Sequence, residues 1–181
     1  MLTDYHVHCE FSDDSVYPME DVVRDAIGLG LEEICFTDHV DYGIKVDWDS
    51  GEEIRWRNGE PFANVDYPRY FAKIADLQEK YGDRIRIRRG LELGVQSHTI
   101  DRYNRLTEKY PLDFAILSIH QVHDQEFWNG EFQEGARRRS TTRSTTGRCC
   151  GWCRVSSTTA CWSTWISLCG MTRRGCIPLR R

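Results

Sequence analysis

Histidines and carboxylates stand at the ends of several strand-like runs, and the first of these runs carries His6 and His8. One residue separates the two histidines. Because side chains on a strand alternate between its faces, both imidazoles are expected to point the same way. Asp13 follows five residues after His8 and can return a carboxylate to the same place from the next loop. This spacing is typical of metal-ion ligands.

Three later positions repeat the arrangement: His39 and His120 each end an apolar run, and Glu92 lies within one. A single histidine on a strand is more often an ordinary core or surface residue, so it is the repetition that favours a metal centre. Glu92 could bridge two metal ions. Imidazole and carboxylate ligands without thiolate suit zinc, iron or manganese. Several such ions together lower the pKa of a bridging water and hold the oxygens of a phosphoryl group.

The spacing of apolar residues predicts an alternation of strands and helices. The predicted strands are residues 2–9, 33–36, 84–94 and 113–119, and the predicted helices are residues 18–27, 67–81 and 100 to about 110. Such alternation argues for parallel strands joined by helical crossovers. Every candidate ligand then falls at or near the C-terminal end of a strand, where barrels and open α/β folds build their sites. Residues 40–64 show no clean period and are predicted to form a long loop serving that site.

Composition limits the class of protein and separates the chain into two parts, residues 1–135 and residues 136–181. The length of 181 residues suits one domain. Residues 1–135 carry all 28 acidic residues and 14 of the 24 basic ones, whereas residues 136–181 carry ten arginines, no acid and six of the eight cysteines. No run approaches the roughly 18 apolar residues of a membrane span, and no signal-peptide pattern is visible. We therefore expect a soluble cytoplasmic protein with reduced cysteines and no membrane partner.

The motifs resemble those of a known superfamily. His6-Val7-His8 with Ser12-Asp13, Thr37-Asp38-His39, Gly90-Leu91-Glu92 and Ser118-Ile119-His120 are similar to the motifs of the polymerase-and-histidinol-phosphatase (PHP) superfamily, and most similar to its monofunctional histidinol-phosphatase branch. The resemblance covers residues 1 to about 134. It implies an α/β fold, namely the N-terminal part of a distorted (β/α)7 barrel, with two or three divalent metal ions (Zn, Mn or Fe).

The resemblance also implies ligand roles. His6 and His8 would hold one metal, and Glu92 would bridge it to a second, which His120 also binds. Asp13 and His39 would belong to a third position, and Asp14 could replace Asp13. Asp38 is expected to support the ligands rather than to bind metal. His123 is expected to contact the substrate phosphate or a metal, although a polar residue lining the mouth is an equally good interpretation.

The implied activity is the removal of phosphate from L-histidinol phosphate, a small-molecule phosphomonoester, in histidine biosynthesis. A metal-bound hydroxide would act as the nucleophile, with no further catalytic side chain implied. Relatives within the superfamily include nucleases and other phosphoesterases, so another phosphoester is an open alternative. A nucleic-acid partner is not favoured by the acidic residues 1–135, and the oligomeric state is open.

Residues 136–181 depart from the family, because they contain no histidine or aspartate for its later His-x-Asp motif. Three interpretations compete. Cys150 and Cys153 could start a zinc module, although no second pair completes it. The arginines could form a nucleic-acid-binding tail. The third hypothesis is a shifted reading frame, because shifted codons across residues 161–166 are compatible with Leu-Val-His-Leu-Asp.

The frame-shift hypothesis is the one we adopt. It predicts that residues 1–135 form the PHP domain and that residues 136–181 are a disordered, non-family tail. A chain with only part of its barrel would expose apolar surface and an unpaired strand edge. An inactive or residual metal-binding fragment is therefore the alternative to a working phosphatase.

Overall fold

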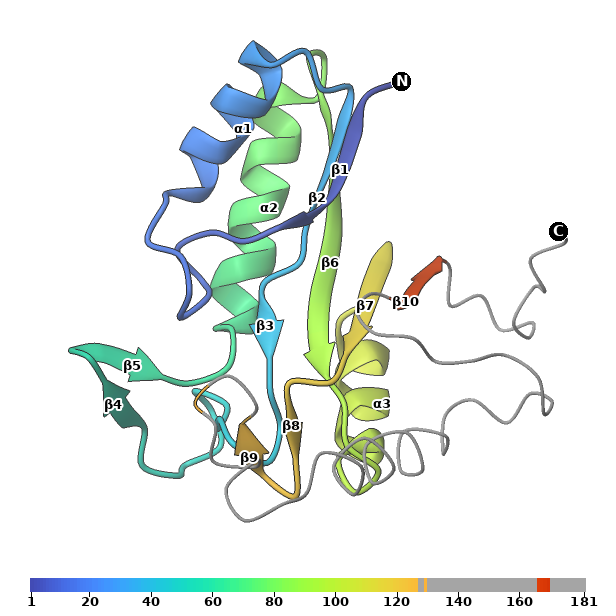
Figure 1. The fold of residues 1–181 in the computed structure, drawn as a ribbon. Coiled ribbons are helices and arrows are strands. Elements are labelled where there is room, and N and C mark those ends of the chain that lie inside the picture. Colours follow the sequence, from blue (N-terminus) through green and yellow to red (C-terminus); the bar gives the residue numbers. More distant parts are fainter. Residues whose placement is uncertain (127–128, 130–165, 170–181) are drawn as a thin grey trace, which may run out of the picture.

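A computed structural model describes residues 1–126, 129 and 166–169. Its centre is a sheet with the strand order β1 (Thr3–Val7), β2 (Glu33–Phe36), β6 (Arg86–Gly94) and β7 (Phe114–Ser118). All three neighbouring pairs are parallel. A short strand, β3 (His39–Val40), continues past the end of β2 and also pairs with β6 in parallel. The predicted α/β class with parallel strands is confirmed (Figure 1).

Three helices connect these strands, as the apolar spacing predicts: α1 (Met19–Gly28), α2 (Tyr67–Tyr81) and α3 (Ile100–Lys109). Helix α1 follows Pro18 and carries Glu20 and Asp21 in its first turn, where acids complement the positive end of the helix dipole. Helix α2 is capped by Asp66, whose side chain accepts a hydrogen bond from the backbone N–H of Arg69. These local signals lie in the sequence itself, which is why the helix starts could be predicted.

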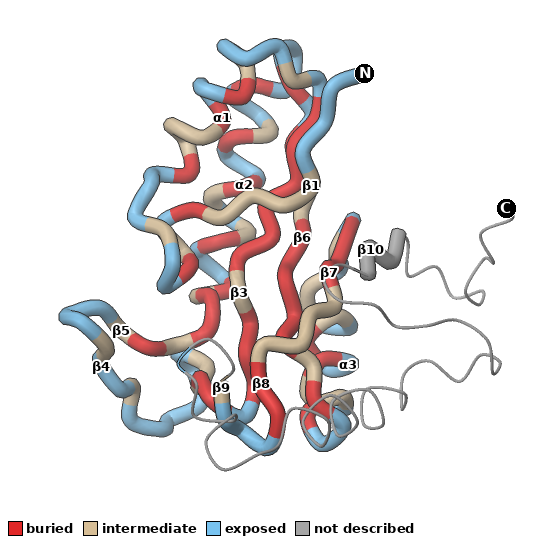
Figure 2. Tube along the Cα trace, viewed as in Figure 1, coloured by how far each residue is buried: buried red, intermediate tan, exposed pale blue. Residues whose placement is uncertain are grey.

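Strand β6 separates the hydrophobic core from the opposite face of the sheet. Leu91 and Leu93 are fully buried and belong to the main core cluster, together with Ile74 and Leu77 of α2. Alternation along the strand directs Glu92, between them, to the other face. Figure 2 shows the buried residues running along β2, β3 and β6 and the inward sides of the helices. The core therefore fixes the strand whose other face carries the predicted bridging carboxylate.

The prediction of a loop over residues 40–64 is wrong for part of that segment. Strands β4 (Arg55–Arg57) and β5 (Glu60–Phe62) form an antiparallel hairpin. Its two-residue turn is Asn58-Gly59, with φ of 54° and 87°. Asn-Gly is a strong signal for such a turn, because both positions need positive φ. The two strands are too short and too charged to show a regular spacing of apolar residues, so only the Asn58-Gly59 pair indicates the hairpin in the sequence.

A second short hairpin follows β7, made of β8 (Gln121–Val122) and β9 (Gln125–Glu126). Most of residues 136–181 lie outside the described residues, including Cys150, Cys153 and most of the predicted disordered tail. The four described ones form β10 (Ile166–Cys169), which pairs with β7 in antiparallel orientation. None of the helices in the described part of the chain is long and apolar enough to span a bilayer.

The packing of α2 on the sheet yields a stability prediction. Ile74 is fully buried in the core cluster, so Ile74→Ala is expected to lower the free energy of unfolding by about 2–5 kcal/mol through lost burial and the cavity left behind. Urea denaturation followed by circular dichroism measures this change. Glu79→Ala, on the exposed side of the same helix, is the matched control. Equal stability of the two variants would contradict the assigned face of α2.

Candidate metal centre

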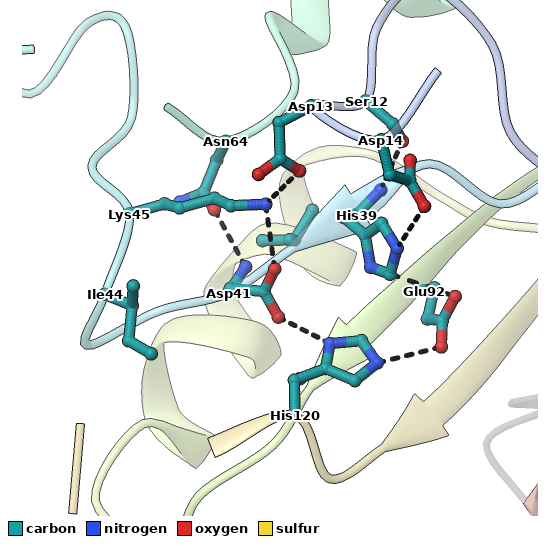
Figure 3. Close-up of polar contacts among 12 residues, drawn as sticks. Ser12, Asp13, Asp14, His39, Asp41, Ile44, Lys45, Asn64, Glu92 and His120 are labelled. Carbon is teal, nitrogen blue, oxygen red and sulfur yellow. Dashed lines mark hydrogen bonds and ion pairs between the residues drawn. The ribbon is translucent and has the colours of Figure 1, made fainter. Parts of the chain in front are cut away.

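The predicted ligands converge at the C-terminal ends of the strands. Within the described residues, three groups of side chains each bring their ligand atoms within 4.8 Å of one another. The groups share members and so form one continuous cluster. Figure 3 shows the part of it that contains Asp14, His39, Asp41, Glu92 and His120. The three groups are His6, His8 and Glu92; His8, Asp14 and His39; and His39, Asp41 and His120.

Glu92 is the centre of this cluster and is only 2% exposed. Its Oε2 lies 3.0 Å from His6 Nε2 and 3.3 Å from His8 Nε2. Its Oε1 lies 3.0 Å from His120 Nε2 and accepts a 2.6 Å hydrogen bond from the hydroxyl of Ser118. Burial alone would raise the pKa of Glu92, but hydrogen bonds from His120, His8 and Ser118 outweigh it and hold that pKa well below its usual range. Each carboxylate oxygen therefore faces imidazoles, the arrangement expected of a bridging ligand.

Hydrogen bonds of Ser12 and Asp38 hold the loop after β1 next to His8. The Ser12 hydroxyl donates to Asp38 Oδ1 at 2.7 Å and accepts from the backbone N–H of His39 at 3.0 Å. It also lies 3.4 Å from His8 Nδ1. Because the Ser12 proton is directed to Asp38, His8 Nδ1 is the donor to Ser12. Nε2 of His8, on the side of Glu92, is then the nitrogen that a metal ion could bind once its proton is released. Asp38 itself is fully buried and belongs to none of the ligand groups.

The structure places Asp14, and not Asp13, among the candidate ligands. Asp14 Oδ2 lies 3.1 Å from His39 Nε2, and its Oδ1 lies 3.7 Å from His8 Nδ1. Asp13 Oδ1 instead accepts a 2.6 Å hydrogen bond from Lys45 Nζ. Sequence spacing cannot choose between two consecutive carboxylates, because the loop backbone directs adjacent side chains in different directions. The geometry therefore favours Asp14, the alternative that the sequence analysis left open, over Asp13.

Asp41 is a candidate ligand that the sequence analysis missed. Its Oδ1 lies 2.7 Å from His120 Nδ1, and its Oδ2 lies 3.0 Å from Lys45 Nζ. It follows His39 at the same one-residue interval that marks His6 and His8, which was the available signal. Residues 40–64 were predicted to be a loop, and in a loop a one-residue interval does not place two side chains on the same side. In the structure β3 begins at His39, so the interval does apply there.

His123 is not brought into the cluster. It lies exposed in the turn between β8 and β9, with a φ of 55°, and belongs to none of the three ligand groups. Its predicted contact with the phosphate remains a prediction.

The cluster fits a divalent cation. His39 Nδ1 is buried without a hydrogen-bond partner and lies 3.8 Å from Glu92 Oε2. An unpaired buried imidazole nitrogen costs about 1–3 kcal/mol, so such atoms are rare in folded proteins unless a ligand uses them. The ligand set is nitrogen and oxygen without sulfur, which suits zinc in a hydrolytic site. A bound metal ion would give His39 Nδ1 a partner, and the nitrogen and oxygen ligands around it are of the kind that zinc binds.

The carboxylates also hold protons on the imidazoles in the metal-free protein. Burial would lower the pKa of His120, but its hydrogen bonds with Asp41 and Glu92 outweigh this effect and raise it to about 10. Burial likewise opposes protonation of His8, whose pKa is nevertheless raised, chiefly by its hydrogen bond with Glu92. Protons and a metal ion therefore compete for the same nitrogen atoms.

A parallel sheet flanked by helices, with histidines and carboxylates gathered at its C-terminal edge, defines a metal-binding domain of the barrel type. Residues 4–154 match the model of the PHP domain family, and the chain belongs to that family. The predicted superfamily and the N-terminal part of its barrel fold are thus confirmed. The match also extends past residue 135, the boundary that composition predicts.

Individual relatives agree with this assignment. The chain is 36% identical over 127 residues to the histidinol-phosphatase of Lactococcus lactis subsp. lactis, covering 70% of this chain and 42% of the relative. It is similar, at 34% identity and a TM-score of 0.67, to a crystal structure of histidinol phosphate phosphatase from Lactococcus lactis complexed with Zn, L-histidinol and phosphate, covering 82% of this chain and 51% of that one. A Listeria monocytogenes structure described as a histidinol phosphatase supports the fold alone, at 23% identity and a TM-score of 0.52 over 66% and 45% of the two chains.

The chain thus spans about half the length of the relatives it matches. The family and the type of ligand together imply a divalent metal, and zinc is the metal in the structure from Lactococcus lactis.

Gly94 yields the first prediction about this centre. A Cβ at this position would overlap Asp41 Oδ1 and lie 3.0 Å from His120 Nδ1. Gly94→Ala is therefore expected to separate Asp41 from His120 and to lower zinc affinity by about tenfold, the usual scale for disturbing a group that orients a ligand. Competition with a chromophoric chelator measures the affinity. Gly28→Ala is the control, because a Cβ there meets nothing within 4 Å.

The proton competition yields a second prediction. Zinc must displace protons from His120 and His8, so zinc affinity is expected to rise between pH 6.5 and 8.5, by about tenfold per pH unit for each proton released. The sign follows from the raised pKa values, because His120, with a pKa of about 10, is protonated at neutral pH without metal, and the raised pKa of His8 acts in the same direction. Calorimetry in two buffers of different ionisation enthalpy counts the protons. An affinity independent of pH would contradict the assignment of these histidines as ligands.

Proposed function

We propose that the chain is a metal-dependent phosphoester hydrolase whose substrate is L-histidinol phosphate, an intermediate of histidine biosynthesis. The observation that carries the proposal is the position of Glu92, whose two oxygens face imidazoles from the ends of two different strands, β1 and β7. The similarity to a histidinol phosphate phosphatase solved with Zn, L-histidinol and phosphate supports this choice of substrate. An enzyme for a small, water-soluble phosphomonoester belongs in the cytoplasm, which is part of the same proposal.

We further propose two or three divalent ions, Zn, Mn or Fe, held by the three ligand groups. When bound, such ions acidify a coordinated water and neutralise phosphoryl oxygens, as Lewis acids. Glu92 joins the groups because its Oε2 faces His6 and His8 while its Oε1 faces His120. His39 serves two groups in the same way, with Nε2 towards Asp14 and Nδ1 buried on the side of Glu92.

The protein residues then supply orientation. Ser12 fixes the tautomer of His8, and Asp41 accepts from Nδ1 of His120, so both imidazoles present Nε2 towards Glu92. The buried carboxylates give the centre a negative field that favours divalent cations. His123, in the exposed β8–β9 turn, is proposed to contact the phosphate from the rim of the site.

A second candidate function is a residual metal-binding fragment without turnover, or a PHP phosphoesterase for another phosphoester. The observation that favours it is the length of the match, about half of each relative, together with the lack of histidine and aspartate in residues 136–181. The later His-x-Asp motif of the family would then be missing from the metal shell.

Substitution of His8 tests the proposed function. Phosphate release from L-histidinol phosphate is measured for the full chain with Zn, Mn or Fe, and His8→Ala is expected to lower it at least about 100-fold, because losing a ligand exceeds the usual effect of losing a ligand's support. His98→Ala is the matched control, since His98 belongs to none of the ligand groups and its side chain is 53% exposed.

The possible outcomes separate the two candidates. Turnover that depends on His8 but not on His98 supports the phosphatase. Zinc binding that depends on His8 without turnover supports the residual fragment, and turnover restored by correcting the reading frame after codon 135 would assign the defect to the C-terminal segment. Absence of zinc binding would contradict both candidates.

A further inference from the structure

Lys45 is a buried cation beside the candidate metal centre that the proposed chemistry does not use. Its side chain is only 4% exposed. Its Nζ lies 2.6 Å from Asp13 Oδ1 and 3.0 Å from Asp41 Oδ2 (Figure 3). It also lies 5.5 Å from the centre of the Phe62 ring. A buried ammonium is costly without partners, so its two carboxylates are part of why this lysine can be buried.

The backbone brings Lys45 to this place directly after β3. The backbone N–H of Lys45 donates to the carbonyl of Asp41 at 2.9 Å, which closes a tight turn between the two residues. Gly43 lies within the turn at a φ of 99°, a conformation that favours glycine. The turn sets the lysine side chain over Asp41, four residues earlier, so the two partners of this ion pair lie close together in the chain.

Asp41 joins Lys45 to the candidate ligands. One oxygen, Oδ2, faces Lys45, and the other, Oδ1, faces Nδ1 of His120 at 2.7 Å. Nε2 of the same imidazole faces Glu92 Oε1 at 3.0 Å. A carboxylate that accepts from Nδ1 fixes the tautomer and the ring orientation of a ligating histidine. The position of Asp41 is therefore what decides how His120 presents Nε2.

We propose that Lys45 is a positioning residue of the metal centre: its ammonium anchors Asp41 against His120 and keeps Asp13 out of the ligand groups. The inference rests on the proposed metal centre and deepens it, because it assigns different roles to two neighbouring carboxylates. Asp14 is left to face the histidines, whereas Asp13 and one oxygen of Asp41 are held by the lysine.

A charge-balanced double variant tests this role. Lys45→Met alone would make the centre more negative and leave Asp13 unpaired, which mixes two effects. Lys45→Met combined with Asp13→Asn removes one cation and one anion, so net charge and volume stay close to those of the native chain while Asp41 loses its anchor. The expected results are zinc affinity lower by about tenfold and a changed visible absorption spectrum of the Co²⁺-loaded protein, with unchanged far-ultraviolet circular dichroism.

Three further variants make the outcome specific. Asp13→Asn alone keeps the contact between Lys45 and Asp41 and is expected to retain zinc affinity and the Co²⁺ spectrum. Lys80→Met removes an exposed lysine near the end of α2 and is the charge control. In an Asp41→Asn background, the double variant is expected to have no further effect on affinity, because Lys45 acts through Asp41.

The opposite results would overturn the proposal. Unchanged affinity and spectrum in the double variant, even with lowered thermal stability, would make Lys45 a purely structural ion pair. Loss of affinity in Asp13→Asn alone would return Asp13 to the ligands. If the double variant does not fold, Lys45→Gln with Asp13→Asn takes its place. It keeps a hydrogen-bond donor for Asp41, so zinc affinity and the Co²⁺ spectrum are expected to be retained, and their loss would contradict the anchoring role. A native chain that binds no zinc would instead refute the metal centre itself.

Discussion

The rest of the structure depends on one buried carboxylate, that of Glu92. An ionised carboxylate removed from water needs compensation that amounts to several kcal/mol. Here the compensation comes from His6, His8 and His120, with Ser118 as a neutral donor. In the metal-free protein these contacts lower the pKa of Glu92 and raise that of His120, which means that protons stand where divalent cations would otherwise balance the charge. The same electrostatic requirement links folding and metal binding at this position.

The topology of the sheet makes this convergence possible. Parallel strands end at the same edge, and β6 lies between β2 and β7, so a side chain at its C-terminal end meets those of both sides. Leu91 and Leu93 anchor that end of the strand in the core, and Glu92 is turned to the other face by alternation alone. Rigid packing on one face thus holds a reactive group on the other, as a preorganised metal centre requires.

Much of this arrangement could be predicted because it is encoded locally. The one-residue interval between His6 and His8, and the apolar neighbours of Glu92, determine which face each side chain occupies. The choice between Asp13 and Asp14 could not be predicted, since it depends on the path of one loop and on Lys45, which is 32 residues away from Asp13 in the chain. The Asn58-Gly59 turn was readable in principle, but the short charged strands around it carry no period. The position of the His123 side chain could not be predicted either, because a motif identifies the residue but not the conformation of the turn that carries it.

The described ligands reach one another through β1, β3, β6 and β7 and the loops that follow them, without any residue beyond 126. Two sets of polar contacts hold candidate ligands in place. Asp38 accepts a hydrogen bond from Ser12, which lies next to His8, and Lys45 contacts Asp41, which lies next to His120. Both act through short hydrogen-bonded contacts within this part of the sheet. The placement of these ligands is therefore a property of the described strands and the loops that follow them. Residues 4–154, which match the PHP domain family, include every member of the three ligand groups.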